Sequence, residues 1–456
     1  MKPLDFSAHG GVWTPCAGSV TPWETHLGSE EYEPDAKAFY EAGAAGDVSM
    51  ITWGALRDFM RYFNVYKQTV TKEEAMAAGF YPYQYGYPWE TKVEADFSET
   101  TTKLYAHGRM SYEMSYVMPD KKTVYGTDDG TNVMFHKFVA TTAGNIEEGV
   151  NYCAKITQTS ADDCEAIDFT AKVEWLEMPT PTSAQVKAAI KTETFSSLFD
   201  SEECNTDGSC PSDGYKATNT GKGCECLKPI AGKEALAATL EKRRYAGWLG
   251  CTTEFSKWEG ITYDAANRKI YTAVSSVGRG MVNNDASRDK GTGNHIKVKE
   301  NSCGCVMEMD VDDSLSTINA RMLTCGTKNT DSAWDDKCSV DGIANPDNVA
   351  MIPDYNQLII GEDTGGHQND LIWIWDFEAK SLTRVASTPY GSETTSPYWY
   401  TVGDWNYMSF VVQHPYGESD QNMLGAAEAT GNLCSRMVIS MQMRDSVTVT
   451  LAPAQA

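Results

Sequence analysis

Residues 113–130 read EMSYVMPDKKTVYGTDDG, and three later stretches repeat their pattern. In each copy, an acidic residue precedes a short apolar run, a turn that contains aspartate, and a second apolar run. The four copies span residues 113–130, 259–276, 347–365 and 393–415, with their turns at Asp120, Asp264, Asp354 and Asp404. Because paired apolar runs on either side of turn residues form antiparallel hairpins, the pattern predicts four β-hairpins.

The repetition of these hairpins predicts a radial array of strands. The leading acids occupy the same end of the first strand in each copy; they are Glu113, Glu259, Asp347 and Glu393. In a radial array these carboxylates point toward one axis, where they repel one another unless cations neutralise them. The pattern therefore predicts a polynuclear metal site, although a barrel or a sandwich would accommodate the same hairpins.

The composition restricts the classes of partner. The chain has 456 residues, a net charge of −25 and an aromatic content of 11%. So acidic a chain is a poor partner for nucleic acid or an anionic membrane, and the aromatic content is typical of a globular β protein. A surface of solvated acids also accounts for much of the charge. We expect a monomer.

The cysteines indicate the compartment. The sequence has 13 cysteines, no apolar run long enough to span a membrane, and no apolar signal core at its start. This cysteine content favours an oxidising compartment, so we expect a secreted or periplasmic protein whose mature form begins here. Four cysteines, Cys204, Cys210, Cys224 and Cys226, lie in a polar loop that we expect to be held by disulfides. Their spacing differs from that of common zinc sites, which leaves zinc as a weaker alternative.

We interpret residues 1–456 as one β-dominated domain with two insertions. Residues 36–80 show helical spacing of apolar residues and predict a helical insertion. Residues 141–245 predict a second insertion, in which two helical segments flank the cysteine-rich loop and form a cap. The apolar pattern near the C-terminus, in residues 435–453, predicts one or two final strands.

The N-terminal stretch 16–33 reads CAGSVTPWETHLGSEEYE and is dense in acids. In a strand, Ser29 and Glu31 would face one side, and His26 and Glu30 the other; an acidic edge strand on the surface is an alternative interpretation. The stretch resembles the Cys-Ala-Gly-Gly, Thr-Pro-Trp-Gly-Thr run, ending in Cys-Glu-Glu, of the PhoX-type alkaline phosphatases. Similar motifs follow in the same order: GRMSYE at 108–113, VYGTDDG at 124–130, TEF at 253–255, PDN at 346–348 and VQHP at 412–415.

This resemblance implies a six-bladed β-propeller with a cap, a central cluster of two ferric ions and several calcium ions, and hydrolysis of phosphate monoesters. By motif position, the resemblance implies that Glu30, Glu113 and Glu393 bind iron. The implied calcium ligands are Glu31, Asp128, Asp129, Glu259 and Asp347.

Two residues depart from the family motif. Ser29 stands where the family has an iron-binding cysteine, and a serine hydroxyl is a far weaker ligand for iron than a thiolate. Glu24 stands where the family has glycine and adds a hard oxygen donor. Both changes favour hard cations such as calcium. Ser29 is also a candidate covalent nucleophile if a metal activates it.

Three functions agree with these features. The first is a secreted metallophosphatase that acts on small phosphorylated organic substrates, with Ser29, Glu30, Glu113 and Glu393 as candidate catalytic residues. The second is a non-catalytic calcium-binding structural or adhesive propeller that has lost the iron site. The third, a sugar-lactone hydrolase on a similar propeller, explains the acids but not the N-terminal motif.

Overall fold

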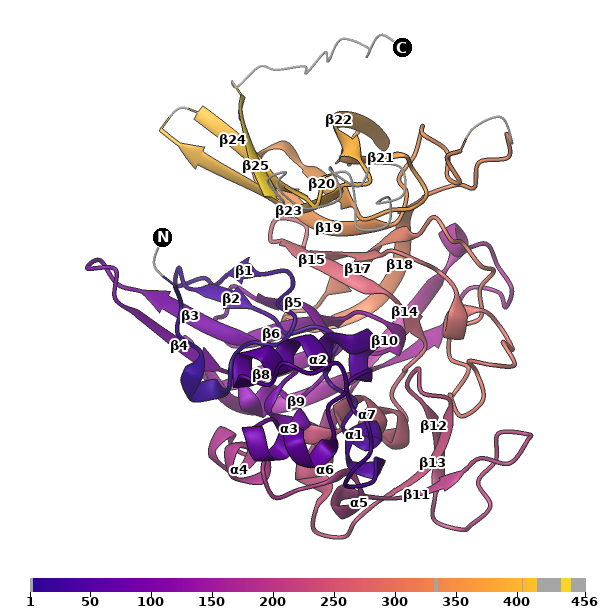
Figure 1. Cartoon of the computed structure of the whole chain (residues 1–456). Coiled ribbons are helices and arrows are strands. Elements are labelled where there is room, and N and C mark those ends of the chain that lie inside the picture. The colour runs from indigo at the N-terminus through magenta and orange to yellow at the C-terminus, as the bar shows by residue number, and fades with distance from the viewer. Residues whose placement is uncertain (1–2, 332–334, 404, 416–435, 444–456) are drawn as a thin grey trace. The chain divides into compact units, whose positions relative to one another are not determined.

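Strands dominate the computed structural model of this chain, which describes residues 3–331, 335–403, 405–415 and 436–443 (Figure 1). The chain divides into two compact units. Unit 1 comprises Met1–Thr157, Val173–Lys257 and Arg279–Lys297, and unit 2 comprises Gln158–Lys172, Trp258–Gly278 and Val298–Ala456. That residues 1–456 form one domain stays a prediction, and each unit is described by itself. No helix in the described part of the chain is long and apolar enough to cross a membrane.

The predicted hairpins are present. The antiparallel pairs are β5 (Tyr112–Val117) with β6 (Thr123–Asp128), β15 (Trp258–Asp264) with β16 (Lys269–Val274), β19 (Pro346–Ile352) with β20 (Gln357–Glu362), and β23 (Glu393–Val402) with β24 (Trp405–Gln413). Aspartate makes the first two turns as expected, since Asp120 Oδ1 accepts from Thr123 N and Asp264 Oδ1 accepts from Ala266 N. The third turn contains Asp354, whereas Asp404 lies outside the described residues.

Unit 1 is built on two antiparallel sheets. One has the order β9-β8-β6-β5, with β8 at His136–Thr142 and β9 at Asn145–Gln158. The other has the order β1 (Ser19–Val20), β2 (His26–Gly28), β3 (Trp89–Val93) and β4 (Glu99–Lys103). A short pair, β7 (Thr131–Val133) with β14 (Phe255–Ser256), completes the strands of this unit that lie near the candidate site.

The predicted helical insertion at 36–80 contains α1 (Ala36–Glu41), α2 (Ala55–Phe59) and α3 (Lys72–Ala78). A capping box at Thr71 and Glu74 begins α3, because each side chain accepts from the other residue's backbone N–H. Apolar side chains of this insertion, among them Phe39, Leu56 and Phe80, pack around the fully buried Trp13 and form a separate core cluster. The insertion therefore has its own small core.

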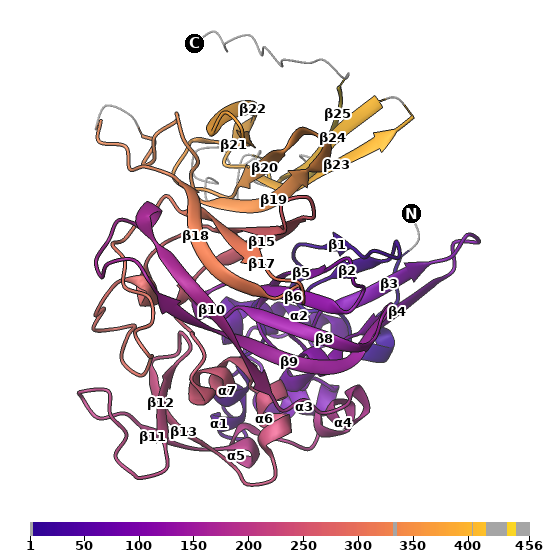
Figure 2. The ribbon, with the colours of Figure 1, turned by 180° about the vertical axis from the view of Figure 1, so that it is seen from behind.

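The region of the second predicted insertion, residues 141–245, contains strands as well as helices, and its bounds stay a prediction. Instead of a cap, residues 145–158 and 170–178 form the long strands β9 and β10 (Thr170–Met178), whose alternate side chains are buried. The helices and the hairpin follow after Met178: α4 (Ser183–Ala189), α5 (Phe195–Leu198), β11 (Phe199–Glu203), β12 (Lys216–Asn219), β13 (Cys224–Pro229), α6 (Glu234–Leu240) and α7 (Lys242–Leu249). Figure 2 shows α4 and α6 close to β9, seen from behind.

Disulfides hold the polar loop of this insertion, as predicted. Cys204 bonds to Cys224 and Cys210 to Cys226, which joins the loops of the β11–β13 sheet and leaves none of the four for zinc. Three further disulfides are Cys153–Cys251, Cys303–Cys338 and Cys305–Cys325. The sequence could not provide these pairings.

Residues at the ends of α6 and α7 complete the N-terminal core. Arg109 is buried, and its Nη1 donates to Leu240 O at 2.8 Å. The Tyr83 hydroxyl donates to Glu241 Oε1 at 2.9 Å, and Lys242 Nζ donates to His107 O. Segments more than 130 positions apart in the sequence therefore satisfy one another's polar groups.

Unit 2 consists of antiparallel meanders. The strands β15-β16-β17-β18 form one, with β17 at Cys305–Val311 and β18 at Thr317–Cys325. The strands β19-β20-β21-β22 form a second, with β21 at Asn369–Asp376 and β22 at Ser381–Tyr390. The third has the order β23-β24-β25, in which β25 (Arg436–Met443) confirms the predicted C-terminal strand. The β-dominated fold with helical and disulfide-bonded insertions is confirmed, and the number of blades stays a prediction.

Candidate metal centre

The N-terminal motif folds back on the segment that precedes it. Cys16 N donates to Ser29 O at 3.1 Å, and Glu31 N donates to Thr14 O at 3.0 Å, so residues 14–16 pair with residues 29–31. Strand β5 runs beside this pair, because Tyr112 N donates to Glu30 O at 3.0 Å. Three segments that are distant in sequence thus meet in unit 1.

Cys16, Glu31 and Glu113 form the first acidic group. One ligand atom from each lies within 4.8 Å of the other two, and Cys16 Sγ lies 3.1 Å from Glu113 Oε2. Glu113 is buried in β5, whereas Cys16 is exposed and lies outside the five disulfides. A thiol between two carboxylates is a donor set that suits iron, since sulfur binds transition metals and the carboxylates offset their charge.

Asp129 extends this group. Its Oδ2 accepts from the Tyr32 hydroxyl and from Lys257 Nζ at 3.2 Å, while its buried Oδ1 has no hydrogen-bond partner. Burial acts to raise the pKa of Asp129, but Lys257 and the side-chain interactions with Glu31 and Tyr32 outweigh it, so the pKa lies below its ordinary value. The Asp129 carboxylate is therefore charged at neutral pH and is available to a cation.

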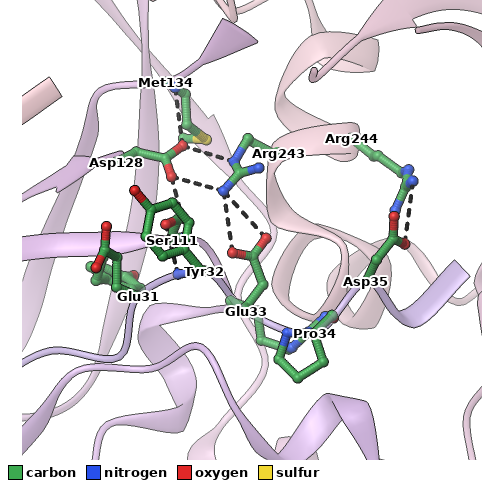
Figure 3. A network of polar contacts seen from close by, with 12 residues as sticks. Glu31, Tyr32, Glu33, Pro34, Asp35, Ser111, Asp128, Met134, Arg243 and Arg244 are labelled. Carbon is green, nitrogen blue, oxygen red and sulfur yellow. Dashed lines mark hydrogen bonds and ion pairs between the residues drawn. The ribbon is translucent and has the colours of Figure 1, made fainter. Parts of the chain in front are cut away.

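Asp128, the neighbour of Asp129, serves a different purpose. Its two oxygens lie 2.9 Å from the Arg243 guanidinium, and Arg243 also contacts Glu33 at 3.2 Å (Figure 3). Ser111 N and Met134 N donate to the same carboxylate at 3.1 Å. Burial raises the pKa of Asp128 to about 6 although Arg243 acts to lower it. These contacts occupy both oxygens, so the structure gives Asp128 a role in fastening α7 to β6.

Glu30 is the anchor of the N-terminal core. Its Oε1 accepts from Lys103 Nζ and Trp13 N at 2.7 Å, and its Oε2 accepts from Gly86 N at 2.9 Å and Tyr87 N at 3.1 Å. The side chains of Glu30 and Lys103 are both 0% exposed. Four donors from the protein saturate this carboxylate, and the assignment of Glu30 as an iron ligand stays a prediction.

The two residues that depart from the family motif lie apart from the acidic group. Ser29 is fully buried, and its hydroxyl has no hydrogen-bond partner. Glu24 is exposed in the turn between β1 and β2, where its backbone is left-handed with a φ of 66°. Among the described residues, Glu24 does not join a group of possible metal ligands.

Unit 2 holds a second pair of acids. Glu259 in β15 and Asp347 in β19 offer carboxylate oxygens within 4.8 Å of each other, and both side chains are buried. Ser275 Oγ donates to Glu259 Oε1, and Asn348 Nδ2 donates to Asp347 Oδ1, each at 2.9 Å. Gly260 allows this approach, because a Cβ there would lie 2.7 Å from the Asn348 Cα. An all-oxygen pair of this kind suits calcium.

Glu393 begins β23, as the hairpin pattern predicts. Its Oε2 accepts from Gln413 Nε2 at 2.8 Å and lies 3.1 Å from His414 Nε2. Within the described part of unit 2, Glu393 does not belong to a group of three possible ligands. Its assignment as an iron ligand therefore stays a prediction.

The residue that sequence reasoning missed is Cys16. The sequence analysis does not name it as a metal ligand, although it opens the N-terminal motif. Two signals could have found it: its place in the motif, and the odd number of cysteines, which leaves at least one thiol outside intramolecular disulfides.

Comparison with known proteins identifies the family. The family model described as "Alkaline phosphatase PhoX" matches residues 3–415. The chain belongs to the PhoX alkaline phosphatase family. No curated protein sequence matches it.

The PhoX fold is also found among solved structures. Pseudomonas fluorescens PhoX, in complex with vanadate as a transition-state analogue, superposes with a TM-score of 0.60 at 17% identity, over 95% of this chain and 70% of that one. A PQQ-bound aldose sugar dehydrogenase from Streptomyces coelicolor covers 95% of both chains at 9% identity, with a TM-score of 0.31. A protein from Lactobacillus plantarum covers 78% of both chains at 8% identity, with a TM-score of 0.29. The first likeness shows the fold, and the other two are too distant to support an argument.

Proposed function

We propose that this PhoX-family chain is a metal-dependent phosphatase that hydrolyses phosphate monoesters, with iron held by Cys16, Glu31 and Glu113. The observation that carries the proposal is the 3.1 Å contact between Cys16 Sγ and Glu113 Oε2 beside Glu31. Together with the family match over residues 3–415, it supplies both a reaction class and a donor set. Cys16 provides the sulfur donor that Ser29 cannot.

Calcium is the second proposed cofactor. Glu259 and Asp347 provide buried oxygens without sulfur or nitrogen, and Asp129 has an unpartnered Oδ1 next to Glu31. Bound cations in such a centre polarise phosphoryl oxygens and lower the pKa of water. The proposed metal ligands are thus Cys16, Glu31, Glu113, Asp129, Glu259 and Asp347, while Glu393 stays a candidate.

Charge explains why this protein needs cations. A phosphate monoester is a dianion, and a chain with a net charge of −25 repels it. Lys257, whose side chain is 40% exposed, is the basic group at the Asp129 carboxylate. We propose that its ammonium group donates to a phosphoryl oxygen and orients the substrate, while Asp129 holds the ammonium in place.

The disulfides support the proposed location. Five disulfides are present among the described residues, and such bonds persist in oxidising compartments. We therefore propose a secreted or periplasmic protein that acts as a monomer on small organic phosphates.

The test compares two thiols that lie outside the disulfides. Cys16→Ser is expected to lose bound iron, its visible absorption band and turnover of p-nitrophenyl phosphate, because the sulfur donor is gone. Cys164→Ser is the matched control and is expected to keep all three, since Cys164 lies outside the acidic group. Metal content is measured by elemental analysis of the purified protein.

Three outcomes would overturn the proposal. Turnover no higher than that of a Glu113→Gln variant, with iron and calcium supplied in acidic, neutral and alkaline buffers, would remove the phosphatase function. Calcium binding without iron or turnover would instead establish the non-catalytic calcium protein, and lactone turnover alone would establish the lactonase.

A further inference from the structure

Four buried oxygens in unit 1 that have no hydrogen-bond partner lie in the loop of residues 279–297 or beside it. They are Asn132 Oδ1, Glu254 Oε1, Asp289 Oδ1 and Asn294 Oδ1. Glu254 and Asn132 are 0% exposed. A buried polar atom without a partner costs about 1–3 kcal/mol, so four in one region of a native protein require an explanation.

Hydrogen bonds hold Glu254 against the turn that carries two of the other oxygens. Ile296 N donates to Glu254 Oε2 at 2.7 Å, which leaves Oε1 for another partner. The turn is compact, because Thr292 Oγ1 donates to Asp289 O at 3.0 Å and accepts from Asn294 N at 3.2 Å. The Thr292 side chain also lies close to the Glu254 carboxylate. Asp289 and Asn294 therefore lie in the turn that Glu254 contacts.

Asn132 approaches the same region from β7. Its Nδ2 donates to Arg288 O at 2.8 Å, next to Asp289 in the chain. A Cβ at Gly280 would lie 3.0 Å from both Asn132 Oδ1 and Glu254 O. The glycine thus permits the loop to bring the Asn132 amide oxygen close to the Glu254 segment.

Within the described residues, neither Glu254 nor Asp289 forms a salt bridge with a lysine or an arginine. Burial, together with the charge of Asp289, raises the pKa of Glu254 to about 7, and burial raises the pKa of Asp289 to about 6. The ion-pairing group near Glu254 within the described residues is His295, whose Nδ1 lies 3.7 Å from Oε1. That nitrogen already pairs with Thr252 Oγ1 at 2.8 Å, and burial lowers the pKa of His295, so the ring is neutral at neutral pH.

Solvent and ions can reach this region. A cavity of ≈ 450 Å³ is lined by Asp289, Thr292 and Asn294, and by two further acids, Asp207 and Asp285. Both of these outer acids already accept from neighbouring serines through Oδ1. They make the opening negative, which favours the approach of a cation.

We propose that one calcium ion binds Glu254, Asp289, Asn294 and Asn132 and thereby holds the 279–297 loop against the rest of unit 1. Two carboxylates and two amide oxygens, without sulfur or a nitrogen free to bind, match the preference of calcium for oxygen ligands. The ion satisfies the four unpartnered oxygens and offsets the repulsion between the two acids. This site is independent of the proposed phosphatase function and does not include the Cys16 group.

Limited trypsin digestion tests the proposal, because Arg288 and Lys290 place cleavage sites next to Asp289. The chelator-treated full chain is digested with and without calcium chloride, and the fragments are mapped by mass spectrometry. At calcium a hundred times its dissociation constant, cleavage at these two sites is expected to slow by about 100-fold, since the ion binds only the closed loop. Magnesium is expected to protect far less, because it demands a stricter geometry.

Substitutions of the proposed ligands test whether they are responsible for the calcium protection against trypsin. Glu254→Gln and Asp289→Asn are each expected to abolish calcium protection and to lower the bound calcium by one ion per chain. Asp285→Asn is the matched control, because it removes one charge from the same loop while its amide oxygen still accepts from Ser287. The centre variant Glu113→Gln is expected to keep the protection, which separates this site from the phosphatase.

The outcomes are decisive in both directions. Equal protection in the wild type and in Glu254→Gln, or no calcium effect in the wild type, would overturn the proposal. If Glu254→Gln does not fold, the half-buried Asp289 carries the test alone, because its substitution changes a residue near the surface.

Discussion

The Glu30–Lys103 ion pair provides the sharpest test of whether Glu30 in the N-terminal motif stabilises the fold or binds a metal. The resemblance implies that Glu30 binds iron, whereas the structure surrounds it with four protein donors, one of them the buried Lys103 ammonium. In Glu30→Gln, the charge of Lys103 loses its partner, and the new amide group faces donors from the backbone. Removal of one member of a buried ion pair costs about 3–5 kcal/mol.

This cost translates into a large thermal shift. For a compact unit of a few hundred residues, each kcal/mol changes the midpoint by roughly 2–4 °C, so Glu30→Gln is expected to lower the midpoint of unit 1 by about 6–20 °C. The measurement is thermal unfolding followed by circular dichroism in the presence of a chelator. The chelator matters because a structural anchor stabilises the protein without metal, whereas a metal ligand does not.

Two variants serve as controls for this measurement. Glu30→Gln combined with Lys103→Met is expected to recover part of the loss, because no unpaired charge remains buried. Glu113→Gln is expected to shift the chelated midpoint little, since it removes one of two carboxylates that repel each other. A Glu30→Gln protein that keeps its midpoint in chelator but no longer binds iron would refute this reasoning and restore Glu30 as a ligand.

Three further predictions concern other parts of the chain. Ser29→Cys is expected to leave iron content unchanged, as measured by elemental analysis, because the Ser29 side chain is fully buried whereas the proposed sulfur donor Cys16 is exposed. Gly260→Ala is expected to cost about 1–3 kcal/mol through overpacking and to weaken calcium binding in unit 2, as measured by denaturant unfolding and calorimetry. Burial alone lowers the pKa of His367, but Glu362 outweighs it and raises the pKa, so this contact stabilises the protein fully below the unfolded pKa of about 6.5 and is lost as pH rises through the folded pKa. The midpoint difference between wild type and His367→Gln is therefore expected to be largest in acid and to vanish in alkaline buffer, and a difference that grows with pH would contradict it.

The sequence predicted what depends on local pattern. Alternating apolar runs with aspartate turns gave the hairpins, and they placed Glu113, Glu259 and Asp347 at or near the starts of their strands. The cysteine-rich loop predicted disulfides, because a loop without a core needs cross-links. The long strands β9 and β10 were not predicted. They lie inside the predicted insertion, and the sequence alone does not show which strands they pair with.

The sequence could not decide between adjacent acids. Glu30 and Glu31 differ by one position, yet the first faces Lys103 in the core and the second faces Cys16. Asp128 and Asp129 divide in the same way, because Arg243, 115 positions away, reaches Asp128. Which member of each pair is available to a metal depends on the tertiary contacts, and these are visible only in the folded chain.

The contacts between the N-terminal core and residues 240–242 have a consequence for biosynthesis. Tyr83, His107 and Arg109 emerge from the ribosome long before the groups that satisfy them. Until then these polar side chains must stay hydrated, so the first half of unit 1 cannot complete its folding before residues 240–242 have been synthesised. Loop closure over such distances is slow, and the Cys153–Cys251 bond then closes behind it. A nascent chain with these contacts therefore keeps the first part of unit 1 incompletely folded until more than half of the 456 residues have been synthesised.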